Sequence, residues 1–263
     1  YKNAKYALAL NSCTAALHLS LILLKLKKND EVITSALTFS STINSIVMAG
    51  AKPVLADVNL ETQNIDPLQI ENKITKKTKA ILIVHFAGRP CNMDAILKIT
   101  KKYKLKLIED CAHSIESKYK NKHLGTFGSF GCFSFYATKN LSIGEGGMLI
   151  TNNKKDYERA RVLSLHGMDK AAWNRYGKKG YRHYDVTEIG YKYNLMDMLS
   201  VIGIIQLKKI DVNNKKREII WQNYNKGFKK LSFNTPANFN KKIIKHSFHL
   251  YNIFINKKKD GIS

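Results

Sequence analysis

Residues 80–110 read AILIVHFAGRPCNMDAILKITKKYKLKLIED, and this stretch decides the fold class. Its two apolar runs, Ala80–His85 and Leu105–Asp110, have the length of buried strands. Between them, Met93–Tyr103 has apolar residues at helical spacing and follows Asn92, a residue type that commonly caps a helix. A strand, a helix and a second strand in this order form a β-α-β unit, in which the two strands lie parallel in one sheet.

The same alternation extends over the first two thirds of the chain. Further strands are expected at Glu31–Thr34 and Pro53–Asp57. Further helices are expected at Thr14–Leu26, Ser40–Ala49 and Pro67–Ile74, the last of them after the cap Asp66. The sequence therefore predicts an α/β protein with a mostly parallel sheet flanked by helices.

The pattern changes after residue 125. Residues 125–147, GTFGSFGCFSFYATKNLSIGEGG, predict a strand, a turn and a second strand, with backbone close to a bound group. Apolar residues recur at helical spacing again over 154–165, and a polar and aromatic loop follows at 167–183. A long helix is then expected from about 196 to 231, and a final strand is expected at His246–Asn256. We expect residues 1–208 to form a large domain, and residues 209–263 to form a connecting helix and the start of a small C-terminal α+β domain. Both domains are expected to be truncated.

Composition limits the classes of function. The 263 residues are 44% apolar, which is enough for a packed core, and 44 Lys and Arg against 20 Asp and Glu give a net charge of +24. Such a charge suits an acidic partner such as nucleic acid, an anionic membrane surface or a phosphorylated small molecule, or it is a lysine-rich bias spread over a solvated surface. The few arginines and the absence of a nucleic-acid-binding motif argue against base readout.

The cysteines and apolar runs give no sign of a metal site or a membrane span. The four cysteines have no paired spacing and no metal-ligand spacing with histidine, so neither a zinc site nor a disulfide framework is expected. The most apolar stretch, Ala15–Leu24, is too short to span a bilayer. We expect no metal, no membrane segment and a cytoplasmic location.

Three features together indicate pyridoxal phosphate (PLP) chemistry. Lys139 follows an apolar run, where desolvation favours a nucleophilic amine that can form a Schiff base, although a surface lysine is the alternative. Asp110 ends a strand at the sheet edge where α/β proteins bind ligands, although a helix cap is the alternative. The segment Asn11–Thr14 begins a helix, where backbone N–H groups bind anions or a side chain simply caps the helix. PLP needs a lysine, an acid for its ring nitrogen and an anion site for its phosphate.

The chain resembles the DegT/DnrJ/EryC1/StrS family of sugar aminotransferases, which are fold-type-I PLP enzymes. Seven blocks carry the resemblance, in the order of the family: SCTAALHL (12–19), EVITSALTFSSTINSIVMAGAKPVLADV (31–58), VHFAGRPCNMDAI (84–96), IEDCAHSIESKY (108–119), GSFGCFSFYATKNLSIGEGGML (128–149), LSLHGM (163–168) and GYKYNLMDMLSVIGIIQLKKID (190–211). The resemblance implies that Lys139 forms the Schiff base and moves the proton, and that Asp110 keeps the pyridine nitrogen protonated.

The resemblance also implies the remaining cofactor-binding residues. His113 lies near the phenolic oxygen, and Phe39 stacks on the pyridine ring. The backbone N–H groups of Thr14 and Ala15 hold the phosphate, with help from the hydroxyls of Thr14 and Ser134. Cys13 stands where the family commonly has glycine, and we expect the phosphate site to survive this difference. Lys192 lies in a loop that reaches the active site of the neighbouring subunit, which implies a homodimer with shared sites.

The family resemblance finally implies a reaction. We expect a PLP-dependent aminotransferase that moves an amino group from an amino acid, expected to be glutamate, to a nucleotide-linked keto sugar for surface polysaccharides. Lys139 argues against the dehydratase branch, which has histidine at that position. The alternatives are a PLP enzyme with another substrate, and a basic regulatory or nucleic-acid-binding protein.

Overall fold

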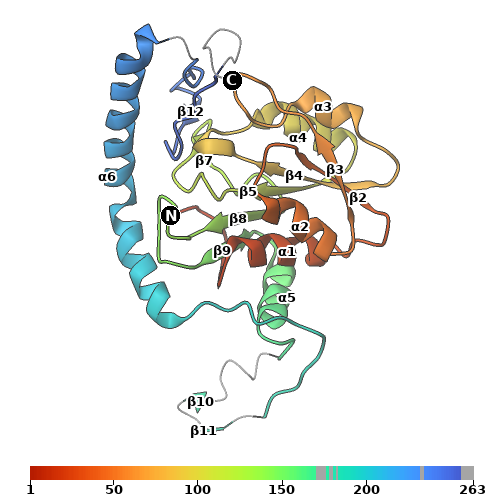
Figure 1. Cartoon of the computed structure of the whole chain (residues 1–263). Helices are drawn as coiled ribbons and strands as arrows, with labels where there is room; N and C mark the ends of the chain where they lie inside the picture. Colours follow the sequence, from red (N-terminus) through yellow and green to blue (C-terminus); the bar gives the residue numbers. More distant parts are fainter. Residues whose placement is uncertain (170–175, 178–179, 182, 232–233, 256–263) are drawn as a thin grey trace.

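A sheet with helices on both faces forms the centre of the computed structural model, which describes residues 1–169, 176–177, 180–181, 183–231 and 234–255 (Figure 1). Within these residues the sheet has seven strands in the order β1-β9-β8-β5-β4-β2-β3. The strands are β1 (Tyr6–Leu10), β2 (Glu31–Ser35), β3 (Lys52–Ala56), β4 (Thr78–Val84), β5 (Lys106–Asp110), β8 (Phe130–Ser134) and β9 (Gly147–Thr151). Strands β3, β2, β4, β5 and β8 pair in parallel, and β9 pairs antiparallel with β8 and β1. The predicted α/β fold class is confirmed.

Shorter strands lie outside this sheet. Strands β6 (Lys118–Tyr119), β7 (Lys122–His123) and β12 (Ile244–Lys245) form a small antiparallel sheet, and β10 (Tyr176–Gly177) pairs with β11 (Gly180–Tyr181). The latter pair falls in the predicted loop at 167–183, of which residues 170–175, 178–179 and 182 lie outside the described residues.

The two faces of the sheet bury different helices because side chains alternate along each strand. Ile81 and Leu107 face α3 (Pro67–Asn72), α4 (Met93–Lys102) and three residues of α6 (Asp197–Gly227), which are Leu199, Leu207 and Ile210. Leu82 and Ile108 face α1 (Cys13–Leu23), α2 (Ser40–Met48) and α5 (Lys154–Ser164). This covering of both faces explains the unbroken apolar runs from which the strands were predicted.

The predicted helix caps are present. Asn92 Oδ1 accepts from the Ala95 N–H at 3.3 Å at the start of α4, and Asp66 Oδ1 accepts from the Leu68 N–H at 2.9 Å at the start of α3. The predicted long helix is also confirmed as α6, followed by a 3-10 turn at Phe228–Lys230. None of the described helices has the length and apolarity required to cross a membrane.

The predicted strand at His246–Asn256 is wrong. Strand β12 ends at Lys245, and between 246 and 255 only Phe254 makes a bridge, to Asn234, while Asn256 lies outside the described residues. The alternating rings of this segment contact the Trp221 ring of α6 instead of alternating across a sheet: His246 at 5.0 Å, Phe248 at 5.5 Å and Tyr251 at 4.8 Å between centroids. Aromatic packing on one helix therefore produced a strand-like pattern.

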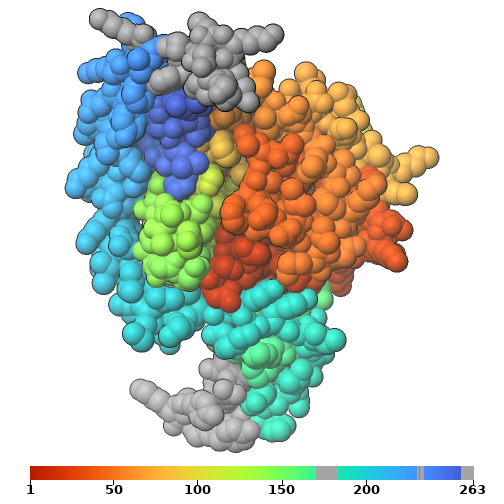
Figure 2. All heavy atoms as spheres, in the orientation of Figure 1, coloured from red at the N-terminus to blue at the C-terminus, as the bar shows by residue number. Residues whose placement is uncertain are grey.

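Residues 244–251 lie between α6 and the rest of the molecule, as the space-filling view shows (Figure 2). The Ser247 N–H donates to the Gly88 carbonyl at 3.1 Å, and the His249 N–H donates to the Ala87 carbonyl at 3.1 Å. Gly88 is required at this approach, because a Cβ there would lie 2.8 Å from the Ser247 Cβ, and its φ is +93°. This part of the predicted second domain therefore contacts the turn that follows β4. The division of the chain at residue 208 remains a prediction.

Candidate active site

A pocket of about 350 Å³ lies at the carboxyl ends of β4 and β5, beside the first turn of α1 and the turn after β8. This is the edge at which open α/β sheets bind ligands. Six of the predicted site residues line it: Thr14, Phe39, Asp110, His113, Ser134 and Lys139. Ala15 and Lys192 do not.

Asp110 ends β5 and is 4% exposed. Its Oδ1 accepts from the Ala112 N–H at 3.0 Å, and its Oδ2 accepts from the Thr42 hydroxyl at 3.0 Å. Burial raises the pKa of this carboxyl, while the two hydrogen bonds and the charge of Lys139 oppose that shift. A cationic partner inside the pocket, such as a protonated pyridine nitrogen, stabilises the charge of a carboxylate that is buried in this way.

Lys139 lies in the tight turn that follows β8, where its N–H donates to the Tyr136 carbonyl at 2.9 Å. Its side chain is partly buried, and burial lowers the pKa of the ammonium group, with the charge of Asp110 acting in the opposite direction. A lower pKa leaves more free amine at neutral pH, which is the form that attacks an aldehyde. Lys139 and Asp110, the two residues on which the sequence interpretation depends, therefore line the same pocket.

His113 presents a donor to the pocket. The Ala87 N–H donates to His113 Nδ1 at 3.3 Å, so Nδ1 is unprotonated and the neutral ring carries its proton on Nε2. Burial lowers the pKa of His113 to about 3, which keeps the ring neutral. The ring packs between Phe86, at 5.9 Å, and His249, at 4.4 Å between centroids. An Nε2–H donor suits the phenolic oxygen of PLP.

The first turn of α1 and the end of β8 form the anion-binding part of the pocket. Ser12 caps α1, and its Oγ accepts from the Ala15 N–H at 3.1 Å, so the N–H group assigned to the phosphate is already bonded to Ser12. Ser12, Cys13, Thr14 and Ser134 line the pocket. Burial raises the pKa of the Cys13 thiol, so no thiolate charge opposes an anion there. A helix N-terminus with two nearby hydroxyls fits a phosphate group.

Phe39 and Lys192 lie further out. Phe39 precedes α2 at the edge of the pocket and is 75% exposed, so its ring is free to cover a bound heterocycle. Lys192 is exposed; its Nζ donates to Asn194 Oδ1 at 2.6 Å, and its carbonyl accepts from Asn11 Nδ2 at 3.2 Å. The action of Lys192 on a neighbouring subunit remains a prediction.

Sequence reasoning missed the residues that support the predicted ones. Thr42 donates to Asp110 and accepts from the Thr38 hydroxyl at 2.7 Å. His249 packs on His113, and its ring also approaches Asn140, the residue after Lys139. The only available signal was the need of a buried carboxylate for donors, which does not specify which of many hydroxyls supplies them.

The residues of the pocket fit PLP in each of its polar parts. Comparisons with known proteins identify the family. The model of the DegT/DnrJ/EryC1/StrS aminotransferase family matches residues 1–262. The chain belongs to this family. The predicted family, the PLP cofactor and the enzyme class, a PLP-dependent aminotransferase, are therefore confirmed.

Relatives and solved structures extend the comparison. The chain is 50% identical over 257 residues to the uncharacterized protein MJ1066 of Methanocaldococcus jannaschii (97% of this chain, 66% of the relative). It is 46% identical over 264 residues to the spore coat polysaccharide biosynthesis protein SpsC of Bacillus subtilis (100% and 67%). Helicobacter pylori PseC, an aminotransferase involved in pseudoaminic acid biosynthesis, superposes with a TM-score of 0.86 at 33% identity (97% and 67%). Spr1654 of Streptococcus pneumoniae in its PLP form gives a TM-score of 0.87 at 30% identity (95% and 67%). The chain thus spans about two thirds of the length of these proteins.

Proposed function

We infer that the protein transfers an amino group from an amino acid, with glutamate as the donor, to a keto sugar linked to a nucleotide. The observation that carries this function is the convergence of Lys139, Asp110 and His113 on one pocket at the sheet edge. SpsC acts in spore coat polysaccharide biosynthesis and PseC in pseudoaminic acid biosynthesis, and both support a sugar acceptor and a role in surface polysaccharide formation.

The six predicted site residues that line the pocket each have a task in this function. Bound PLP supplies an aldehyde that condenses with amines and a protonated ring that withdraws electrons. Asp110 would hold the proton at the ring nitrogen, and the Nε2–H of His113 would donate to the phenolic oxygen. Lys139 would hold the cofactor covalently, and its free amine would accept and return the proton at the substrate carbon. Thr14 and Ser134 would bind the phosphate, and Phe39 would cover the ring.

The net charge and the loop of Lys192 are compatible with the proposed substrate and assembly. A nucleotide diphosphate is strongly anionic, so the net charge of +24 assists its capture. A homodimer places Lys192 of each subunit at the phosphate of the other site. We propose that the enzyme acts in the cytoplasm. A PLP enzyme with a different acceptor is the alternative.

The test uses the full-length protein. Glutamate is expected to convert the absorbance of the bound cofactor to that of its aminated form, and one member of a panel of nucleotide keto sugars is expected to restore it. Borohydride reduction followed by peptide mass analysis is expected to place the cofactor on Lys139, and Lys139→Ala is expected to bind cofactor without covalent attachment. Normal turnover by Lys139→Ala would refute the role assigned to Lys139. If only keto acids restore the original absorbance of the cofactor, the acceptor is a keto acid and not a sugar.

A further inference from the structure

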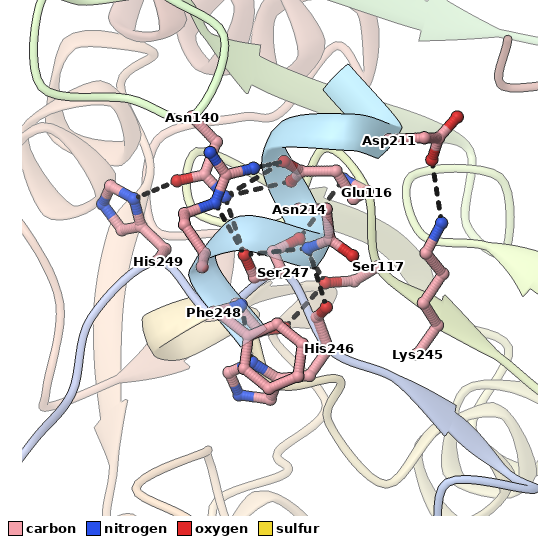
Figure 3. Close-up of polar contacts among 12 residues, drawn as sticks. Glu116, Ser117, Asn140, Asp211, Asn214, Lys245, His246, Ser247, Phe248 and His249 are labelled. Atoms are coloured by element: carbon pink, nitrogen blue, oxygen red, sulfur yellow. Dashed lines mark hydrogen bonds and ion pairs between the residues drawn. The ribbon is translucent and has the colours of Figure 1, made fainter. Parts of the chain in front are cut away.

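Four segments that are distant in sequence meet around Asn140, the residue after Lys139 (Figure 3). They are the loop after β5 with Glu116, the turn of Lys139 with Asn140, helix α6 with Arg217, and the segment 246–249. Glu116 is fully buried, and its carboxylate forms an ion pair with Arg217. The same carboxylate accepts from Asn140 Nδ2 at 3.0 and 3.2 Å. A buried carboxylate with these partners is an acceptor that fixes the orientation of its neighbours.

The orientation of the Asn140 amide follows from its acceptors. Nδ2 donates to the Glu116 carboxylate and to the Ser247 carbonyl at 2.9 Å, and neither of these groups can donate. Oδ1 must therefore point the other way, toward His249 Nδ1 at 2.9 Å. Figure 3 shows Asn140 between Glu116 and His249. Because Oδ1 accepts only, His249 must donate, and its proton lies on Nδ1.

The His249 ring continues this chain of contacts into the active site. It lies on the His113 ring with centroids 4.4 Å apart and an interplanar angle of 31°. Burial lowers the pKa of His249 to about 4, which keeps the ring neutral. The two stacked imidazoles therefore carry opposite tautomers: Nδ1–H on His249, set by Asn140, and Nε2–H on His113, set by Ala87.

Residues other than Asn140 also anchor the backbone of this segment. Asn214 Nδ2 donates to the carbonyls of His246 and Ser247, both at 3.2 Å. The Ser247 hydroxyl bonds to that of Ser117 at 2.6 Å and accepts from the Glu116 N–H at 3.2 Å. Both asparagines therefore bond to the Ser247 carbonyl, but only Asn140 also bonds to the His249 ring. This difference makes the two asparagines a matched pair for mutation.

We propose that His249 is a positioning residue of the active site: Arg217, Glu116 and Asn140 fix its Nδ1–H tautomer, and its ring sets the orientation of His113. The positioning of a donor to PLP rests on the function proposed above, whereas the tautomer of His249 does not. The role fits chemistry in which a small displacement of a donor from its acceptor lowers the rate strongly.

The first test is nuclear magnetic resonance of the full-length protein, labelled with ¹⁵N-histidine and free of cofactor. The eight histidines are few enough to assign with His113→Gln and His249→Gln variants. The expected spectrum shows Nδ1–H for His249 and Nε2–H for His113. Asn140→Ala is expected to give a mixture of tautomers at His249, while Asn214→Ala keeps Nδ1–H. An Nε2–H tautomer at His249 in the unmodified protein would overturn the proposal, as would the same spectrum in both asparagine variants.

The second test separates positioning from packing. His249→Phe keeps a ring against His113, whereas His249→Ala removes it. His249→Ala is expected to lower kcat by about tenfold with KM changed by less than about twofold, and His249→Phe, which packs on His113 but cannot bond to Asn140, is expected to recover only part of that loss. Equal kcat in His249→Ala and the unmodified protein would contradict the role of the ring. If PLP binds but no keto sugar is aminated, the proposed function fails. The tautomer measurement does not depend on activity, so it still tests how Asn140 orients His249.

Discussion

The bond from Thr42 to Asp110 makes the sharpest prediction about the pocket. The Thr42 hydroxyl donates to Asp110 Oδ2 at 3.0 Å, and both residues are buried. Thr42→Val keeps the shape of the side chain and removes the donor. A hydrogen bond to a charged group contributes about 1.5–3 kcal/mol, whereas one to a neutral group contributes about 0.5–1.5 kcal/mol. The cost of Thr42→Val should therefore depend on whether Asp110 is ionised.

The sign of this dependence follows from the pKa of Asp110. Burial raises that pKa above its ordinary value, and the bond from Thr42 opposes the shift. A carboxyl with a raised folded pKa favours the fold at low pH, and this contribution is lost as pH rises through the folded pKa. Thr42→Val raises the folded pKa further, so its free-energy cost is expected to grow with pH, from about 1 kcal/mol at pH 4 to about 1.5–3 kcal/mol at pH 8.

Urea unfolding of the cofactor-free protein at both pH values measures this difference. Ser45→Ala is the control, because Ser45 is buried on the same helix and its hydroxyl donates to the Thr42 carbonyl at 3.0 Å instead of to Asp110. Its cost is expected to be the same at both pH values. A cost of Thr42→Val that does not change between pH 4 and pH 8 would refute the reasoning.

Three further substitutions probe the pocket and its support. Asp110→Asn is expected to lower turnover by about 10²–10⁴-fold, because the pyridine nitrogen loses its anionic partner; steady-state rates within twofold of normal would reject this role. Phe39→Ala is expected to weaken cofactor binding by about 0.5–1.5 kcal/mol, as measured by titration of the protein with PLP, through loss of ring stacking. Gly88→Ala is expected to cost about 1–3 kcal/mol of unfolding free energy, because its φ is +93° and its Cβ would meet Ser247 at 2.8 Å. Gly50→Ala, at φ +79° with no atom within 4 Å, should cost less in the same denaturation experiment.

The central strands could be predicted from the sequence because a strand that is buried on both faces of a sheet has an unbroken run of apolar residues. The runs at Ala80–His85 and Leu105–Asp110 correspond to β4 (Thr78–Val84) and β5 (Lys106–Asp110). Strand β1 (Tyr6–Leu10) was not predicted; it lies at the edge of the sheet, with mixed burial along its length. The other edge strand, β3 (Lys52–Ala56), was predicted at Pro53–Asp57, so local pattern missed one of the two edges of the sheet.

The site residues fall into two groups: those that a local sequence pattern identifies, and those that only folding brings together. Lys139 and Asp110 could be found because each stands at the end of an apolar run, and both line the pocket. The hydrogen bonds of Asn140 could not be found, since its partners Glu116, Ser247 and His249 become neighbours only in the folded chain. One sequence contains no local pattern for such contacts, because they depend on where α6 and the segment after it pack.

The contacts around Asn140 also set an order of events during synthesis. They join Glu116 to Arg217 across 101 positions of the chain, Asn140 to His249 across 109, and Ser117 to Ser247 across 130. These contacts can form only after residues 217–249 have been synthesised, whereas the last strand of the sheet, β9, ends at Thr151. On the ribosome, the sheet can assemble while residues after 151 are still being added, whereas the turn of Lys139 gains its last support only when His249 has emerged. A nascent chain released before that residue would have the sheet but lack the finished catalytic turn.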